Sequence, residues 1–278
     1  MRVALPGRTH RLAGLMCSGP VFVTEQAGEE AVRAATVAFC SLFAPAMAAL
    51  RSRMSFAMSS ARPAADFAAH WSAPGEGERL WFLGTLAIIR VPGEAVDGRL
   101  AVIEFLFPRH ASPPLHTHPQ DESYIVLDGQ LTVHADGERF RLSAGGTGVV
   151  PAEVPDIFDG QYPGAMRFLT DHLEAQQVAL THRVMPPKSG GKGSYGPRHK
   201  TQEQIYFVIS GTLQFKLDDQ IIDVPAGTAV RVAPAVTRSI WNDGPSDAEL
   251  VICSTRLKDP HADGELIEDF WPVNGAGP

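Results

Sequence analysis

The sequence contains two copies of one β-type unit, offset by 82 positions without a gap. Aromatic, aliphatic and glycine residues coincide under this offset. The matched pairs are Tyr124 and Tyr206, Val126 and Val208, Gly129 and Gly211, Leu131 and Leu213, Asp136 and Asp218, Gly145 and Gly227, and Val150 and Val232. An internal repeat of this density predicts two similar domains in tandem.

Just before the first copy, the stretch 114–129 brings two histidines and a glutamate close together. His116 and His118 are separated by one residue, so on an extended strand both imidazoles point to the same face. Glu122 follows a short loop at the start of the next strand, so its carboxylate can close the same site. Imidazole with carboxylate suits iron, manganese, nickel, copper or zinc better than calcium or magnesium. The three residues are candidate ligands of one divalent transition metal; the alternative is two loop histidines beside a solvated acidic run.

The spacing of these ligands resembles the first metal motif of the cupin superfamily. The stretch Gly145–Phe158 resembles the second cupin motif, in which a histidine supplies the last ligand. The frame holds as far as Pro151, but Glu153 stands in the glycine position and Asp156 in the histidine position.

Three interpretations of Asp156 stay open. It binds the metal directly or through water, or the first three ligands form a two-histidine, one-carboxylate triad with open positions, the arrangement of non-haem iron oxygenases. In the third interpretation Asp156 caps a turn, and the site holds metal weakly or not at all.

The second copy lacks an equivalent ligand set. Under the offset, the residues that match His116, His118, Glu122 and Asp156 are Arg198, Lys200, Gln204 and Arg238. If the loop is one residue shorter, they are Pro197, His199, Gln204 and Arg238. Arginine offers only hydrogen-bond donors and neutral glutamine is a poor ligand. The second domain is therefore structural, or it binds an organic anion with Arg238, Arg198, His199 and Gln204.

The resemblance implies an all-β fold of two tandem jelly-roll barrels, a bicupin. We expect the metal-binding barrel over residues 61–175 and the barrel without ligands over 176–278. An Asp-Gly pair at Asp136 predicts a hairpin between Gln130–His134 and Arg139–Leu142. Residues 1–60 differ in pattern: Glu29–Met58 is alanine-rich, which favours a poorly ordered or loosely helical tail, and Met54 and Met58 leave the natural start open.

The composition narrows the partners to small molecules. A net charge of −7 and a pI near 5.8 argue against nucleic acid or an anionic membrane. The uncharged run from Ala34 to Leu50 is too short and alanine-rich for a membrane span.

Three cysteines in unrelated contexts imply no disulfide framework, which favours a reducing, cytoplasmic setting. Sheet edges of such barrels favour a homodimer.

Residues 64–170 are similar to quercetin 2,3-dioxygenase-type cupins, on the runs 80–86, 113–118 and 121–129. The resemblance implies a metal-dependent dioxygenase, with iron as the first candidate metal, acting on a phenolic or enolic, flavonol-like or polyketide-like small molecule. Glu122 would be the general base and O2 the co-substrate. Aromatic side chains suited to a flat ligand, each of which could equally be core, are Trp81, Phe105, Tyr124 and Phe158. The alternatives are a non-oxidative isomerase or cyclase and a non-catalytic binding protein.

Overall fold

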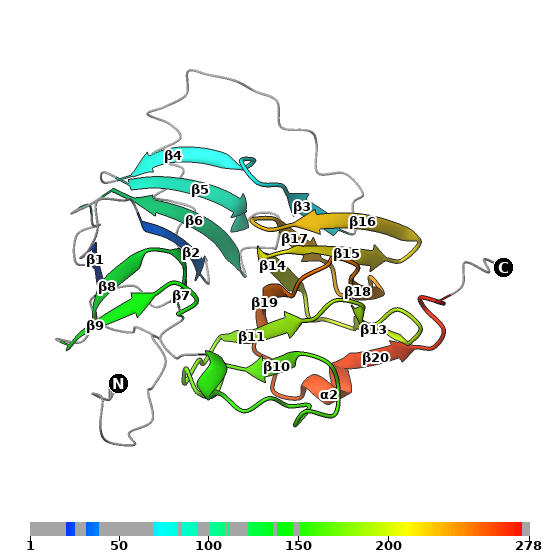
Figure 1. The fold of residues 1–278 in the computed structure, drawn as a ribbon. Helices are drawn as coiled ribbons and strands as arrows, with labels where there is room; N and C mark the ends of the chain where they lie inside the picture. The colour runs from blue at the N-terminus through cyan, green and yellow to red at the C-terminus, as the bar shows by residue number, and fades with distance from the viewer. Residues whose placement is uncertain are drawn as a thin grey trace.

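The computed structural model describes residues 21–25, 32–38, 69–82, 85–93, 100–108, 111, 122–135, 138–146 and 151–273. Within these ranges the regular secondary structure is almost entirely β-strand, folded as two barrels side by side (Figure 1). The helical turns whose bounds are described are η2 (Pro151–Glu153) and α2 (Pro260–Asp263). None of the helices in the described part is long and apolar enough to cross a membrane. The predicted all-β fold of two tandem jelly rolls is confirmed.

The second barrel is built from two antiparallel sheets over an apolar core. One sheet has the order β10-β11-β19-β14-β17-β3 and the other β12-β18-β15-β16. The strands are β3 (Ala69–Ser72), β10 (Ala165–Phe168), β11 (Val178–Met185), β12 (Ser189–Gly190), β14 (Gln204–Ser210), β15 (Thr212–Leu217), β16 (Gln220–Pro225), β17 (Ala229–Val232), β18 (Arg238–Asn242) and β19 (Ala248–Thr255). Val208, Phe215 and Leu250 lie in the buried cluster between these sheets. A two-stranded ribbon of β13 (Gly196–His199) and β20 (Gly264–Ile267) lies beside them.

The first barrel contains a five-stranded sheet in the order β4-β5-β6-β2-β7 and a three-stranded sheet in the order β1-β8-β9. The strands are β1 (Val21–Glu25), β2 (Val32–Ala38), β4 (Glu78–Phe82), β5 (Thr85–Val91), β6 (Ala101–Phe107), β7 (Glu122–Asp128), β8 (Gln130–Ala135) and β9 (Glu138–Ser143). Antiparallel pairing of β8 with β9 confirms the predicted hairpin.

The offset of 82 positions is reproduced strand by strand. The bounds of β7, β8 and β9 coincide under it with those of β14, β15 and β16. Hydrogen bonds outside the strand ladders repeat as well: Val126 N–H donates to the carbonyl of Gly146 at 3.0 Å, and Val208 N–H to that of Thr228 at 3.1 Å. The repeat in the sequence is therefore a repeat in structure.

The turns of the repeat depend on glycine at two matched positions. Gly129 and Gly211 have φ values of 80° and 78°, a region that other residues adopt only with strain. At Gly211 a Cβ atom would also come within 2.8 Å of the Cβ of Ala248. The same tight turn thus follows the first strand of each copy.

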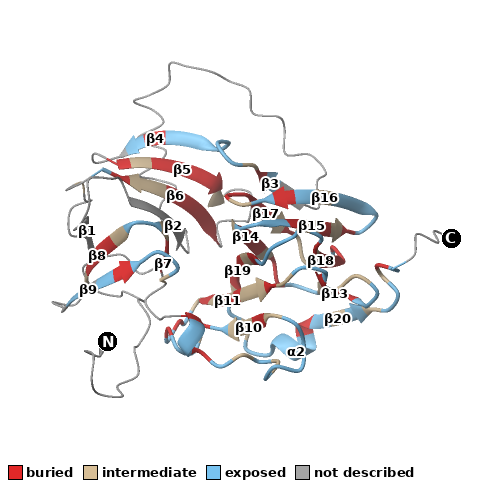
Figure 2. Ribbon diagram, viewed as in Figure 1, coloured by how far each residue is buried: buried red, intermediate tan, exposed pale blue. Residues whose placement is uncertain are grey.

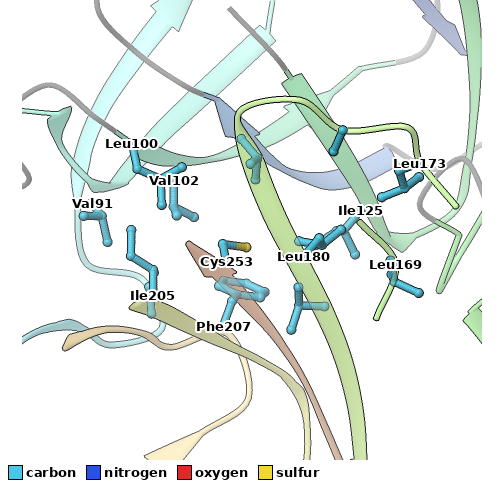
Figure 3. Packing of buried hydrophobic residues seen from close by; sticks show 14 of the residues in the cluster. Val91, Leu100, Val102, Ile125, Leu169, Leu173, Leu180, Ile205, Phe207 and Cys253 are labelled. Atoms are coloured by element: carbon cyan, nitrogen blue, oxygen red, sulfur yellow. The ribbon is translucent and has the colours of Figure 1, made fainter. Parts of the chain in front are cut away.

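One buried apolar cluster joins the two barrels, and we call it the interface cluster (Figure 3). Side chains alternate along β14 and β19, so Tyr206 and Val208 face the second barrel's core whereas Ile205 and Phe207 face the first barrel. The members of the cluster from the first barrel include Val91, Leu100, Val102 and Ile125, and the half-buried Leu127 packs against it. Figure 2 shows the resulting burial along β5, β6, β14 and β19, in contrast to the exposed β4 and β16.

A buried ion pair reinforces this junction. Arg90 and Glu104 are 2% and 1% exposed, and Nε and Nη2 of Arg90 donate to Oε2 of Glu104 at 2.9 and 2.5 Å. Nη1 of Arg90 donates to the carbonyl oxygens of Ala73 and Glu76, each at 2.7 Å. Ala73 directly follows β3, which pairs with β17 of the second barrel. The ion pair therefore ties the first barrel to a segment that completes the second barrel's sheet.

The N-terminal region differs from the expected helical or poorly ordered tail where it is described. Val21–Glu25 and Val32–Ala38 are strands, and β2 lies between β6 and β7. Alanine is the best helix former, but intrinsic propensity is small in energy, and backbone pairing with two neighbouring strands overrides it here. Residues 1–20, 26–31 and 39–68 lie outside the described ranges.

Sheet membership also crosses the expected domain boundary at residue 175. Both β3 and β10 precede this boundary, yet they form one edge strand each of the second barrel's six-stranded sheet. Edge strands satisfy their backbone groups wherever a free sheet edge is close, and sequence order does not decide which edge that is.

Candidate functional site

Strand β7 positions the candidate catalytic carboxylate. Ile125 and Leu127 belong to or pack against the interface cluster, so the alternate residues Glu122, Tyr124 and Val126 face the opposite way, into the first barrel. The same alternation directs Gln204, Tyr206 and Val208 into the second barrel, whose core contains the last two.

Glu122 is buried, with 6% of its surface exposed. The hydroxyl of Tyr124 donates a hydrogen bond to its Oε2 at 2.6 Å. A short hydrogen bond to a carboxylate is stronger than one between neutral groups, so it fixes the direction of the Glu122 side chain. The predicted base, Glu122, thus lies inside the barrel, and the hydrogen bond from Tyr124 orients its carboxylate.

His116 and His118 fall in 112–121, outside the described residues. The described part of the chain contains no group of three or more His, Cys, Asp or Glu side chains placed to hold a metal ion. His118 is four residues from Glu122 along the chain, a reach of at most about 14 Å. The three-ligand set stays a prediction, of which the structure describes Glu122.

Asp156 lies in a turn after η2, and its carboxylate binds the backbone of that turn. Oδ1 accepts hydrogen bonds from the N–H groups of Met166 and Phe158 at 2.8 and 3.2 Å, and Oδ2 accepts one from Gly160 at 3.4 Å. These bonds, that of Met166 first, lower the pKa of Asp156 despite partial desolvation.

The repeat also ends at Asp156. Arg238, its counterpart under the offset, begins β18 and pairs with Leu217 of β15, whereas Asp156 precedes a run of turns. A turn explains the short side chain without a metal, because aspartate readily accepts hydrogen bonds from nearby backbone N–H groups. Ligation by Asp156 stays a prediction.

The predicted aromatic walls lie in different surroundings. Phe105 is half-buried and stacks on Phe107, with ring centroids 5.4 Å apart and planes at 24°. Phe158 is half-buried and packs edge-on against Tyr162 at 5.3 Å. Trp81 is 66% exposed. Tyr124 is buried on β7 and donates to Glu122. The role of each ring toward a substrate stays a prediction.

The second barrel carries a polar cluster at the position that matches the β7 site. Oε1 of Gln204 accepts hydrogen bonds from the hydroxyl of Tyr206 at 2.6 Å and from Nη2 of Arg238 at 2.5 Å, and Nε of Arg238 donates to the hydroxyl of Tyr206 at 3.1 Å. Tyr206 and Arg238 are 5% and 4% exposed. Gln204 and Arg238, predicted from the sequence as neighbours, are thus brought together.

His199 lies at the edge of this cluster, next to Asp263. Its Nδ1 is 3.3 Å from Oδ2 of Asp263, without hydrogen-bond geometry. Burial and then the charge of Arg238 lower the pKa of His199, against the opposing effect of Asp263. Arg198, also predicted here, instead pairs with Glu265 of β20 through Nε and Oε2 at 2.7 Å.

Sequence reasoning missed Arg183 of β11. Burial lowers its pKa, and the nearby Tyr206 and Tyr195 oppose this. Arg183 alternates with His182, whose ring bonds Glu249 at 2.5 Å, and shares a strand face with Met185 of the second barrel's core. A lone arginine among the apolar and small residues of this strand was the available signal. We call the set Arg183, His199, Gln204, Tyr206 and Arg238 the second-barrel cluster.

Comparison with known proteins gives one family and several partial likenesses. The cupin domain model matches residues 103–170 and 184–254, together half of the chain. Quercetin 2,3-dioxygenase of Bacillus subtilis is 33% identical over 85 residues, 30% of this chain and 25% of that protein. Endoribonuclease YbeY of Myxococcus xanthus is 33% identical over 86 residues, 31% of this chain and 29% of that protein. The chain thus spans under a third of the length of these curated relatives.

The solved structures that match parts of this chain do so at low identity and low TM-score. A predicted oxalate decarboxylase of Thermotoga maritima covers 34% of this chain and 81% of its own at 21% identity and a TM-score of 0.30. The polyketide cyclase RemF of Streptomyces resistomycificus covers 44% of this chain and 84% of its own at 16% identity and a TM-score of 0.35.

Proposed function

The chain belongs to the cupin family, and from that premise we propose that its first barrel is a metal-dependent dioxygenase acting on a phenolic or enolic small molecule. The observation that carries the proposal is the buried Glu122, held by the hydroxyl of Tyr124 on the inner face of β7. The partial identity to a quercetin 2,3-dioxygenase supports the choice of reaction.

The donor chemistry of the site fits a divalent transition metal. A carboxylate in a barrel interior is costly to desolvate, and a bound cation would offset that cost. His116 and His118, close before Glu122 in the sequence, would supply two neutral imidazoles. We propose that these three residues hold one ion, with iron first among the candidates, and that Asp156 keeps its turn. The metal would act as a Lewis acid toward the oxygen of the substrate.

The protein groups would bind and deprotonate the substrate. Glu122 would accept the proton of the phenolic or enolic hydroxyl, and Tyr124 would keep the carboxylate directed into the barrel. Phe105 and Phe107, stacked on the inner face of β6, offer a flat apolar surface for an aromatic ring. Deprotonation makes such a substrate electron-rich and prepares it for reaction with O2.

Metal analysis and oxygen uptake test the proposal together. Protein purified without chelator should hold close to one transition-metal ion per chain, and His116→Ala should lose it, whereas His172→Ala at an exposed turn should not. Oxygen uptake should follow addition of a flavonol. Well under one ion per chain in the unaltered protein would refute the metal site. Turnover in the absence of oxygen would indicate an isomerase or cyclase instead of a dioxygenase. Bound metal with no turnover, with or without oxygen, would indicate a binding protein.

A further inference from the structure

The second barrel holds two arginines that have no carboxylate partner among the described residues. Arg238 is 4% exposed, and the half-buried Arg183 lies on the same barrel face, close to Tyr206. Neither arginine forms an ion pair with a carboxylate of the described residues. Asp263 lies 3.3 Å from His199 and accepts a hydrogen bond from Thr201, and Glu249 binds His182. Burying a guanidinium without an opposite charge is expensive, so a fold that keeps Arg238 here has a reason to do so.

Arg238 also has a buried donor left over. Its Nε and Nη2 donate to Tyr206 and Gln204, both neutral, but Nη1 is buried and has no hydrogen-bond partner in the described part of the chain. Buried donors in folded proteins are nearly always satisfied, and each exception calls for an explanation such as a bound water, ion or ligand. Nη1 therefore points to an acceptor that the protein itself does not provide.

The neighbouring groups restrict what that acceptor can be. Nδ1 of His199 is also buried; it lies 3.3 Å from Oδ2 of Asp263, outside hydrogen-bond geometry. The lowered pKa of His199 keeps the ring neutral at neutral pH, so it offers one donor and one acceptor. Two arginines and a neutral imidazole exclude a metal cation and favour an anion.

We propose that the second-barrel cluster binds a small organic carboxylate, with Arg238 Nη1 as its main donor and Arg183 as the second cationic group. A guanidinium and a carboxylate match in planarity and charge, and the few unpartnered donors here suit two oxygens better than the four of a phosphate. This site is separate from the proposed metal site, since β7 and β14 belong to different barrels.

The test is a titration of the full-length protein with sodium benzoate at constant ionic strength, followed by the thermal unfolding midpoint and by calorimetry. Benzoate should raise the midpoint saturably. Arg238→Met should weaken the apparent affinity by about 10-fold or more, as expected for loss of a buried, charged hydrogen bond. Arg183→Met, whose side chain makes no hydrogen bond in the described part, should weaken it as well and serves if the first variant does not fold.

Two matched variants locate the effect. Arg198→Met removes an arginine that is already paired with Glu265, and it should keep the full response. His116→Ala should also keep it, because benzoate bound to a metal in the first barrel would be lost in that variant. No saturable response, or an undiminished response in both Arg238→Met and Arg183→Met, would overturn the proposal. A response to phosphate but not to benzoate would overturn the choice of a carboxylate.

Discussion

Arg238 donates from Nη2 to Oε1 of Gln204 at 2.5 Å, in the place where the first barrel has a buried glutamate. The adjoining contact is common to both barrels: Tyr206 donates to Gln204 at 2.6 Å, and Tyr124 donates to Glu122 at 2.6 Å. The repeat has thus kept the tyrosine and exchanged the carboxylate for an amide beside an arginine. The two barrels present opposite charges at equivalent positions.

Gln204→Glu should neutralise Arg238 from within the protein. The new carboxylate would form an ion pair with the guanidinium that now donates to the amide oxygen. The unfolding midpoint should therefore rise while benzoate binding weakens several-fold. Thermal unfolding with and without benzoate measures both effects. The exposed Gln220→Glu is the matched control and should change neither. Tighter benzoate binding in Gln204→Glu would contradict this assignment.

Asp156→His restores the residue of the cupin motif at this position. Because the Asp156 carboxylate binds three backbone N–H groups of its own turn, the variant should lose stability without gaining metal affinity. Competition with a metal chelator measures the affinity, and Asp156→Asn is the control for the turn. Tighter metal binding in Asp156→His would show instead that this position faces the ion.

Glu104→Ala should destabilise the protein strongly. It leaves Arg90 buried without its counter-charge at the junction of the barrels, which typically costs about 3–5 kcal/mol of unfolding free energy. Asp171→Ala removes the partner of Arg256 at the surface, where such pairs contribute at most about 1 kcal/mol. Urea denaturation of the two variants compares them, and equal losses would contradict a special role for the buried pair.

Acid should weaken the protein through Glu249. The hydrogen bond from His182, more than any other effect, lowers the pKa of Glu249 below its ordinary value of 4.5. Its stabilising contribution is therefore complete well above that value and is lost as pH falls through the folded-state pKa. Urea midpoints between about pH 6 and pH 3 should fall less steeply in Glu249→Gln than in the unaltered protein. Identical slopes would show that other carboxylates account for the loss.

Cys253 should resist alkylation in the folded protein. It has no exposed surface in the interface cluster, and burial strongly raises the pKa of its thiol. Since the thiolate is the reactive form, iodoacetamide should modify this residue only when the barrels separate or unfold. Peptide mapping by mass spectrometry after labelling with and without urea checks this. Labelling at the unfolded rate without urea would mean that the interface opens readily.

The sequence alone determined the features that depend on local chemistry. The positive φ of Gly129 and Gly211 requires glycine in both copies, and the alternation of apolar residues assigned β7 and β14 as matching strands. The 82-residue offset followed from coinciding residue types and the hairpin from the Asp-Gly pair, and the offset placed Gln204 and Arg238 at neighbouring positions of one site.

Only the tertiary structure decided what depends on contacts between distant segments. Arg183 joined the second-barrel cluster because β11 turns one face into that barrel, and β3 completed a sheet of the other repeat. Asp156 occupies its position in the motif, but its carboxylate accepts a hydrogen bond from the N–H of Met166, ten residues further along the chain. Such outcomes arise because burial and backbone satisfaction are properties of the whole fold, whereas a motif specifies only residue type and spacing.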